Sequence, residues 1–107
     1  MANTFVGTQA YMSPERMEGE QYSYEGDIWS LGIVIVELMT GKFPFTMNKG
    51  FFEMLDQIKE QESPNVPDNE LYSEDLRDFI SRCLKKETGD RDTSISLLAH
   101  PWILNHS

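Results

Sequence analysis

Few residues of this chain have the types and the spacing that catalysis or metal binding requires. The candidates are two histidines, His100 and His106, a single cysteine, Cys83, and 18 acidic residues spread over 107 positions. No metal-ligand spacing occurs among them, and no serine, histidine and aspartate present themselves as a catalytic triad. Gly-x-Gly is also absent, so the chain has no glycine-rich loop that could bind phosphate.

The charge of the chain argues against two classes of partner. Lys and Arg total 9 and Asp and Glu total 18, which gives a net charge of −9 at pH 7. Such a surface repels nucleic acid and anionic membranes, so we expect neither as a partner. It could attract basic partners, although a net charge of this kind usually only keeps a protein soluble. The single cysteine cannot form an internal disulfide, which is typical of a reducing compartment and favours a cytoplasmic location.

The element that must position the other residues is the stretch GDIWSLGIVIVELMTG. It is apolar on almost every side, and its polar residues Asp27, Ser30 and Glu37 form one narrow line. A surface helix would have an apolar stripe and a broad polar face, so the stretch predicts a buried central helix over 26–40. Gly41 is expected to end the helix, because glycine adopts a positive φ at little cost. The run is too short for a membrane span, and its length favours a helix over a buried strand.

Three outer helices are predicted from apolar residues at spacings of three and four. They cover residues 50–59, 74–86 and 93–100. The inward residues are, in chain order, Phe51, Met54, Leu55, Ile58, Leu76, Phe79, Ile80, Cys83, Leu84, Ile95, Leu98 and Ala99. Ser73 and Thr93 are expected to cap the second and the third of these helices. No strand is convincing, so the predicted class is mainly helical.

The remaining segments are predicted to be irregular. Residues 1–17 form an extended loop that ends in a turn of helix, with Ser13 as its cap and Pro14 at its first position. Residues 60–69 are charged and contain two prolines, which predicts a mobile linker. Trp102 is expected to fold back onto the core. These patterns together indicate a small, acidic, helical domain whose first segment is exposed.

Three motifs in this order resemble the protein kinase domain. Residues 7–15, GTQAYMSPE, look like the end of an activation segment and its substrate-binding loop, and residues 27–32, DIWSLG, look like the start of the central helix of the kinase large lobe. The last kinase motif is matched at its spacing by Leu84, Arg91, Leu98, His100, Pro101 and Trp102. Any one motif alone would be a weak signal, whereas the three cover most of the chain. The resemblance implies the carboxyl-terminal part of a large lobe, with helices around one buried central helix.

A narrower resemblance is to the MAP kinase kinases, the dual-specificity enzymes that activate MAP kinases. Residues 5–8, FVGT, residues 11–16, YMSPER, and residues 81–86, SRCLKK, are similar to that group. A kinase of the neighbouring Ste20 class is the alternative, and Arg16 favours the MAP kinase kinases. The resemblance implies a parent enzyme that is activated by an upstream kinase and transfers phosphate from ATP, with Mg, to hydroxyls of a MAP kinase.

The same resemblance implies that the chain by itself is inactive and holds no cofactor. A kinase binds ATP with a glycine-rich loop and a strand lysine, and it does chemistry with an HRD catalytic loop and a DFG aspartate. None of these motifs occurs in the 107 residues, which predicts a fragment of a kinase. Two other hypotheses stay open, namely a non-catalytic, kinase-derived module that binds protein partners and an unrelated helical bundle.

The resemblance assigns roles to individual residues of the first segment. The substrate-binding residues would be Gly7, Thr8, Gln9, Ala10, Tyr11 and Met12. Thr8 would also support the catalytic aspartate of the absent loop, and Tyr11 and Met12 would line the pocket beside the phosphoacceptor. Thr4 matches an activation-loop phosphorylation site of the family, where phosphate would add about −1.5 to −2 charges. The alternative for each of them is an ordinary loop or core residue.

Four further residues are expected to support the structure. Glu15 and Arg91 resemble the buried ion pair with which kinases hold the substrate-binding loop against the helical base. Asp27 resembles an acid that accepts hydrogen bonds from the catalytic loop, and in this chain its remaining role would be to cap its own helix. Trp29 belongs to the same motif and is expected to be structural.

The central helix is also expected to lack part of its cover, because the resemblance places that cover outside this chain. An exposed apolar face favours association or leaves a domain marginally folded. Either of two arrangements would cover the exposed face. Residues 1–12 could dock across it, or a dimer could bury Ile28, Trp29, Ile33, Val36 and their neighbours.

Overall fold

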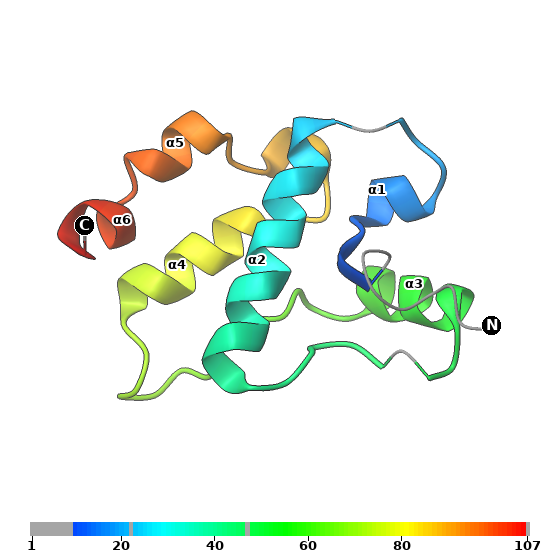
Figure 1. The fold of residues 1–107 in the computed structure, drawn as a ribbon, viewed down its shortest axis with the longest axis horizontal. Helices are drawn as coiled ribbons and strands as arrows, with labels where there is room; N and C mark the ends of the chain where they lie inside the picture. Colours follow the sequence, from blue (N-terminus) through cyan, green and yellow to red (C-terminus); the bar gives the residue numbers. More distant parts are fainter. Residues whose placement is uncertain (1–9, 22, 47, 107) are drawn as a thin grey trace.

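In the computed structural model, which describes residues 10–21, 23–46 and 48–106, helices pack along one long central helix. The elements are α1 (Pro14–Met17), α2 (Tyr24–Thr40), α3 (Phe51–Glu60), α4 (Glu74–Cys83), the 3-10 turn η2 (Thr88–Asp90), α5 (Ser94–Leu98) and α6 (Pro101–His106). Figure 1 shows α2 in the middle, with α4 on one side, α1 and α3 on the other, and α5 and α6 beyond α4. The described ranges contain no strand, and the predicted mainly helical class is confirmed.

The central helix, α2, begins two residues before the predicted start. Ser23 is its N-cap residue, so the expectation that Asp27 caps the helix is wrong. Asp27 and Glu25 lie instead in the first turn, where negative charge interacts favourably with the helix dipole. The helix ends where it was predicted to end, because Gly41 adopts a left-handed conformation with φ of 77°.

On one side of α2, α4 packs closely against Gly32. A Cβ atom at this position would lie 2.7 Å from the Cβ atom of Cys83 and 2.7 Å from a methyl carbon of Leu84, so the contact requires a glycine. The predicted apolar stripe of α4 is buried as expected: Leu76, Phe79, Ile80, Cys83 and Leu84. The helix itself ends at Cys83, three residues before the predicted end, and Leu84 is its C-cap residue.

A further face of α2, which none of the described helices covers, leaves apolar side chains exposed. Leu31, Val34 and Leu38 are 41%, 37% and 75% exposed, and they follow one another at spacings of three and four. The expectation that the helix lacks part of its cover is therefore confirmed, whereas the apolar pattern by itself predicted a helix buried on every side. The residues expected in a dimer interface are instead buried inside the chain, each at most 8% exposed: Ile28, Trp29, Ile33 and Val36.

The short helix α5 presents a different side to the core from the predicted one. All three residues that were predicted to face inward are exposed: Ile95, Leu98 and Ala99. Leu97 is buried in their place. The helix has only five residues, and a capping box between Thr93 and Ser96 determines where it begins. Fewer than two helical turns give too little periodicity for a sequence pattern to identify the inward side.

After α5 the chain folds back onto α4, as predicted for Trp102. The ring centroids of Trp102 and Phe79 are 4.9 Å apart. His100 lies at the turn, where its Nδ1 accepts a hydrogen bond of 3.0 Å from the amide of Trp102. Its Nε2 therefore carries the proton, and it donates to Oδ2 of Asp78 at 2.7 Å. Both ring nitrogens are used locally, so His100 has a structural role.

The segment between α3 and α4 is irregular but anchored, which corrects the prediction of a mobile linker. Val66 is only 2% exposed and belongs to the core. The hydroxyl of Ser63 donates to the carbonyl of Leu84 at 2.6 Å, and the side-chain Nδ2 of Asn65 donates to the carbonyl of Arg77 at 3.0 Å. The two prolines correctly exclude a helix, but they carry no information about whether the segment is bound.

Candidate functional site

The described end of the first segment lies against α2, where the polar line of that helix holds Tyr11. The phenol of Tyr11 donates a hydrogen bond of 2.5 Å to Oε1 of Glu37. The hydroxyl of Ser30 donates to the carbonyl oxygen of Tyr11 at 2.6 Å and to that of Gly26 at 3.2 Å. The sequence showed the polar line on this helix but not that it binds Tyr11, because Ser30 and Glu37 lie 19 and 26 positions after Tyr11 in the chain.

The ring of Tyr11 is also packed by aromatic residues from the loop that follows α2. Its centroid lies 5.6 Å from that of Phe43 in an edge-to-face contact, and Phe43 makes a similar contact with Phe45 at 5.9 Å. The carboxylate of Glu37, which accepts from the phenol, raises the pKa of Tyr11, and burial adds to this effect. The phenol therefore remains a hydrogen-bond donor well beyond neutral pH.

The turn of helix after Tyr11, α1, forms as the sequence predicted. The hydroxyl of Ser13 accepts a hydrogen bond of 3.4 Å from the amide of Arg16, and Pro14 occupies the first helical position. This turn places Glu15 inward, where only 8% of the residue is exposed. Burial of a carboxylate is unfavourable unless a cation or hydrogen-bond donors satisfy it.

Arg91 provides that partner, so the ion pair expected from the resemblance is present. Its Nη1 lies 2.9 Å from Oε2 of Glu15 and its Nη2 lies 3.1 Å from Oε1, which makes the pair bidentate. The remaining N–H groups donate to the carbonyls of Glu25, Lys85 and Lys86 at 2.7, 2.8 and 3.2 Å. All five donors of the guanidinium are thus used, and its side chain is fully buried.

The Glu15–Arg91 pair joins three distant parts of the chain. Glu15 belongs to α1, Arg91 follows η2, and the guanidinium lies 5.4 Å from the ring centroid of Trp29 in α2. Burial by itself raises the pKa of Glu15, but the hydrogen bonds from Arg91 and from nearby backbone and Ser13 outweigh it, so the net pKa is lowered. The carboxylate stays ionised at neutral pH.

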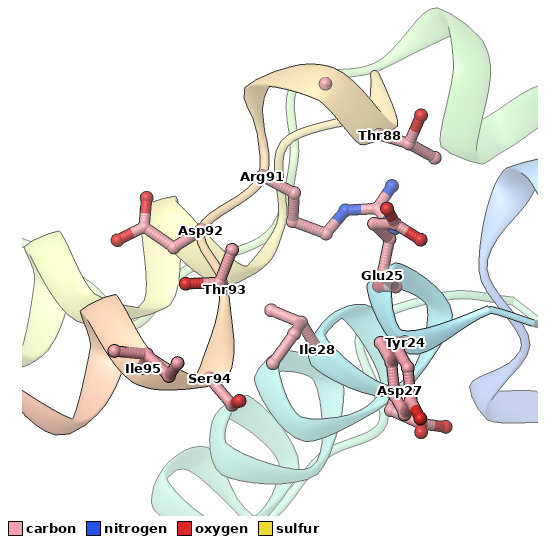
Figure 2. A pocket seen from close by; sticks show the side chains of 11 residues that line it. Tyr24, Glu25, Asp27, Ile28, Thr88, Arg91, Asp92, Thr93, Ser94 and Ile95 are labelled. Carbon is pink, nitrogen blue, oxygen red and sulfur yellow. The ribbon is translucent and has the colours of Figure 1, made fainter.

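A cavity of about 570 Å³ opens beside this pair, between the first turn of α2 and the start of α5. Figure 2 shows Ile28 at its centre, with Asp27 on one side and Ser94 on the other. Glu25 and Asp92 also line the cavity. Two of the charged residues that line the cavity are paired, because Arg91 binds Glu15 and Oδ2 of Asp92 lies 3.5 Å from Nη1 of Arg82.

The structure brings together only some of the residues assigned from the sequence. Ala10 is 4% exposed, and Met12 is partly buried against the core beside Tyr11. Four assigned residues lie outside the described residues: Thr4, Gly7, Thr8 and Gln9. Burial raises the pKa of the Cys83 thiol to about 12, which leaves it unreactive at neutral pH. Within the described ranges, no three histidine, cysteine or acidic side chains are grouped to hold a metal ion.

Comparison with known proteins places these features in a family. The model of the protein kinase domain matches residues 1–103. The chain is 45% identical to mitogen-activated protein kinase kinase 3 of Arabidopsis thaliana, over 99% of this chain and 20% of that protein. It is 46% identical to mitogen-activated protein kinase kinase 1 of the same plant, over 96% of this chain and 30% of the relative.

The similarity extends to animals. The dual specificity mitogen-activated protein kinase kinase dSOR1 of Drosophila melanogaster is 38% identical over 96% of this chain and 32% of its own length. The chain therefore spans only about a fifth to a third of the relatives that it matches. In the described part of the chain, every helix is too short or too polar to cross a membrane.

Proposed function

This chain belongs to the protein kinase family, and from that premise we propose that it is the carboxyl-terminal part of the large lobe of a MAP kinase kinase. The whole kinase would transfer phosphate from Mg-ATP to Ser, Thr or Tyr hydroxyls of a MAP kinase. The similarity to MAP kinase kinases of plants and of an insect over nearly the full chain supports this proposal. The kinase would act in the cytoplasm, downstream of an activating kinase.

The observation that carries the proposal is the buried, bidentate pair of Glu15 and Arg91. It ties α1, which directly follows the proposed substrate-binding residues, to the helical base of the lobe. A loop that receives a protein substrate must keep one position relative to the catalytic residues, because small displacements of reacting groups are costly in rate. The pair would supply such an anchor for the proposed substrate-binding loop.

We assign the chemistry itself to motifs outside these 107 residues. The chain contains no glycine-rich loop, HRD motif or DFG motif, so ATP and Mg would bind to the rest of the kinase domain. Thr8 would help to orient the catalytic aspartate there, and Thr4 would accept phosphate from the upstream kinase. The contribution of the present segment would be to position the substrate and to support the activation segment.

The test compares the 107-residue chain with the protein encoded by the full coding sequence. We expect the longer protein to phosphorylate a MAP kinase in the presence of Mg-ATP, and the 107-residue chain to show neither transfer nor binding of Mg-ATP by calorimetry. Saturable micromolar binding of Mg-ATP to the short chain would contradict the proposed division of roles. A full coding sequence without HRD and DFG motifs would contradict the proposed kinase activity.

A second candidate function is a non-catalytic module that binds protein partners. The uncovered apolar face formed by Leu31, Val34 and Leu38 favours it, because exposed apolar patches often mark interaction sites. Self-association of the chain through the same face is the simplest form of this candidate. The same full coding sequence discriminates between the two functions, since only the enzyme requires the catalytic motifs.

A further inference from the structure

The carboxyl end of α3 is bound by a side chain from the segment that follows α4. The ammonium group of Lys86 donates hydrogen bonds to the carbonyl oxygen of Lys59, at 3.1 Å, and to that of Gln61. The last carbonyls of a helix have no partner within the helix, and the helix dipole makes a cation favourable at this end. Lys86 therefore binds the end of α3 through both its hydrogen bonds and its charge.

The backbone of the same segment binds the guanidinium of the buried ion pair. The carbonyl of Lys86 accepts a hydrogen bond of 3.2 Å from Nη2 of Arg91, and the carbonyl of Lys85 accepts one of 2.8 Å from Nε. The hydroxyl of Ser63, which follows α3, donates to the carbonyl of Leu84 at 2.6 Å. This stretch of backbone is therefore bound to α3 and the segment after it on one side, and to Arg91 on the other.

We propose that Lys86 is a positioning residue for the binding of the protein substrate, because its side chain fixes the backbone that orients Arg91. Arg91 in turn binds Glu15, which lies in α1 directly after the proposed substrate-binding loop. The inference rests on the proposed function. It adds that the anchor of this loop depends on the end of α3 and on the positive charge of Lys86, in addition to the ion pair itself.

The geometry of the site explains why the charge of Lys86 matters. Glu15, Lys59 and Lys86 line one cavity of about 220 Å³, so the end of α3 and the ion pair lie close to the same lysine. An ammonium group has three N–H donors, whereas the thioether of a methionine of similar length has none. A methionine at position 86 would leave the two carbonyls of α3 without this partner and would release the backbone that holds Arg91.

The kinetic test uses the full-length kinase, with a MAP kinase as the protein substrate. We expect Lys86→Met to raise the KM for the protein substrate by about two- to thirtyfold, the range for substitutions that act on a site through a chain of contacts. Lys86→Arg keeps the positive charge and N–H donors, so it should retain most of the affinity. The KM for ATP should stay unchanged in both variants, because ATP would bind elsewhere in the kinase domain.

A matched control separates this role from a general effect of charge. Lys85 precedes Lys86 in the chain and is exposed, and only its backbone carbonyl binds Arg91 in the contacts described above. Lys85→Met removes the same charge but keeps that carbonyl, so it should leave both KM values unchanged. An active kinase in which Lys86→Met has the KM of the unmodified enzyme for the protein substrate, or in which Lys85→Met raises this KM equally, would overturn the inference alone.

A second measurement tests the link from Lys86 to Glu15 without relying on activity. Burial raises the pKa of Glu15, but the hydrogen bonds that it accepts, above all from Arg91, outweigh burial and lower the net pKa. In the 107-residue chain with ¹³C-labelled glutamate, the carboxyl NMR signal of Glu15 should therefore titrate at higher pH in Lys86→Met than in the unmodified chain or in Lys85→Met.

The two measurements together distinguish the inference from the proposed function. An unchanged titration of Glu15 in Lys86→Met would overturn the inference, whatever the activity of the full-length protein. If the signal shifts as expected but the full-length protein phosphorylates no MAP kinase, the proposed function fails, and with it the role of Lys86 in substrate binding.

Discussion

The two sides of α2 are similar in sequence and different in surroundings. On the side that faces α4, Ile33 is fully buried and Gly32 leaves no space for a methyl group. On the other side, Leu31 and Leu38 are 41% and 75% exposed, although they are as apolar as the residues of the packed side. The difference teaches that an apolar helix indicates how much surface needs cover, but not which element of the chain supplies that cover.

The packed side is also the side on which the ionic anchor lies. Arg91 contacts Trp29 and the carbonyl of Glu25, so the guanidinium covers the beginning of α2 while it binds Glu15. The uncovered side shows no comparable ion pair among the described residues. Changes on the two sides should therefore have very different energetic consequences, which the following predictions rank from the largest to the smallest.

Arg91→Met should have the largest effect. It leaves the carboxylate of Glu15 buried without its partner, so we expect the free energy of unfolding to fall by about 3–5 kcal/mol. Lys59→Met is the matched control, because it breaks an ion pair with Glu18 whose side chains are 51% and 43% exposed. That control should have little effect on stability, because solvent screens an exposed ion pair. Urea-induced unfolding measures both, and equal stability of the two variants would contradict the anchoring role of Arg91.

Gly32→Ala should be the next most harmful change, because the added methyl group would overlap Cys83 and Leu84. We expect a loss of about 1–3 kcal/mol from overpacking, which outweighs the roughly 0.5–1 kcal/mol that alanine adds to a helix interior. Leu38→Ala on the uncovered side should change the stability by no more than about 0.5 kcal/mol. If thermal unfolding shows Leu38→Ala to be the more harmful of the two, then the assignment of packed and uncovered sides is wrong.

The stability of the packed side should also depend on acidic pH through Glu15. Its pKa in the folded chain is lowered from the ordinary value of 4.5, so its contribution is fully present above pH 4.5. That contribution is lost as the pH falls through the lower, folded-state pKa, because the unfolded chain then binds the proton more readily. As the pH falls below 4.5, the unmodified chain should therefore lose stability more steeply than Glu15→Gln. Parallel pH profiles for the two proteins would refute this expectation.

A substitution on the uncovered side should have the smallest effect on stability, but it should change the self-association of the chain. Leu38→Glu should change the free energy of unfolding by less than about 0.5 kcal/mol, yet it should weaken self-association because it places a charge on the exposed apolar face. Leu71→Glu is the control, since Leu71 is 82% exposed and lies in a loop outside this face. Sedimentation velocity at several concentrations reports the association. A monomeric unmodified chain at high micromolar concentration would show that this face does not drive association.

Part of the candidate site was predictable from local patterns. Ser13 and Pro14 correctly predicted the turn that presents Glu15, because caps and proline positions depend only on neighbouring residues. The pairing of Glu15 with Arg91, across 76 positions, came from the resemblance to kinases and not from spacing. The contact of Glu37 with Tyr11 was not predicted at all, although the polar line on an otherwise apolar helix was the signal that could have suggested a buried partner.

By itself, the sequence determined the local features of this protein: mainly helical structure, the end of α2 at Gly41, and the inward stripe of α4. These follow from side-chain periodicity and backbone preferences, which act within a few residues. Only the tertiary structure decided which side of α2 is covered, which side of the five-residue α5 faces inward, and that Val66 anchors the segment between α3 and α4. Those outcomes depend on contacts between residues far apart in the chain. A helix that is apolar all round, or shorter than two turns, has no distinct apolar stripe that would show which side faces the core.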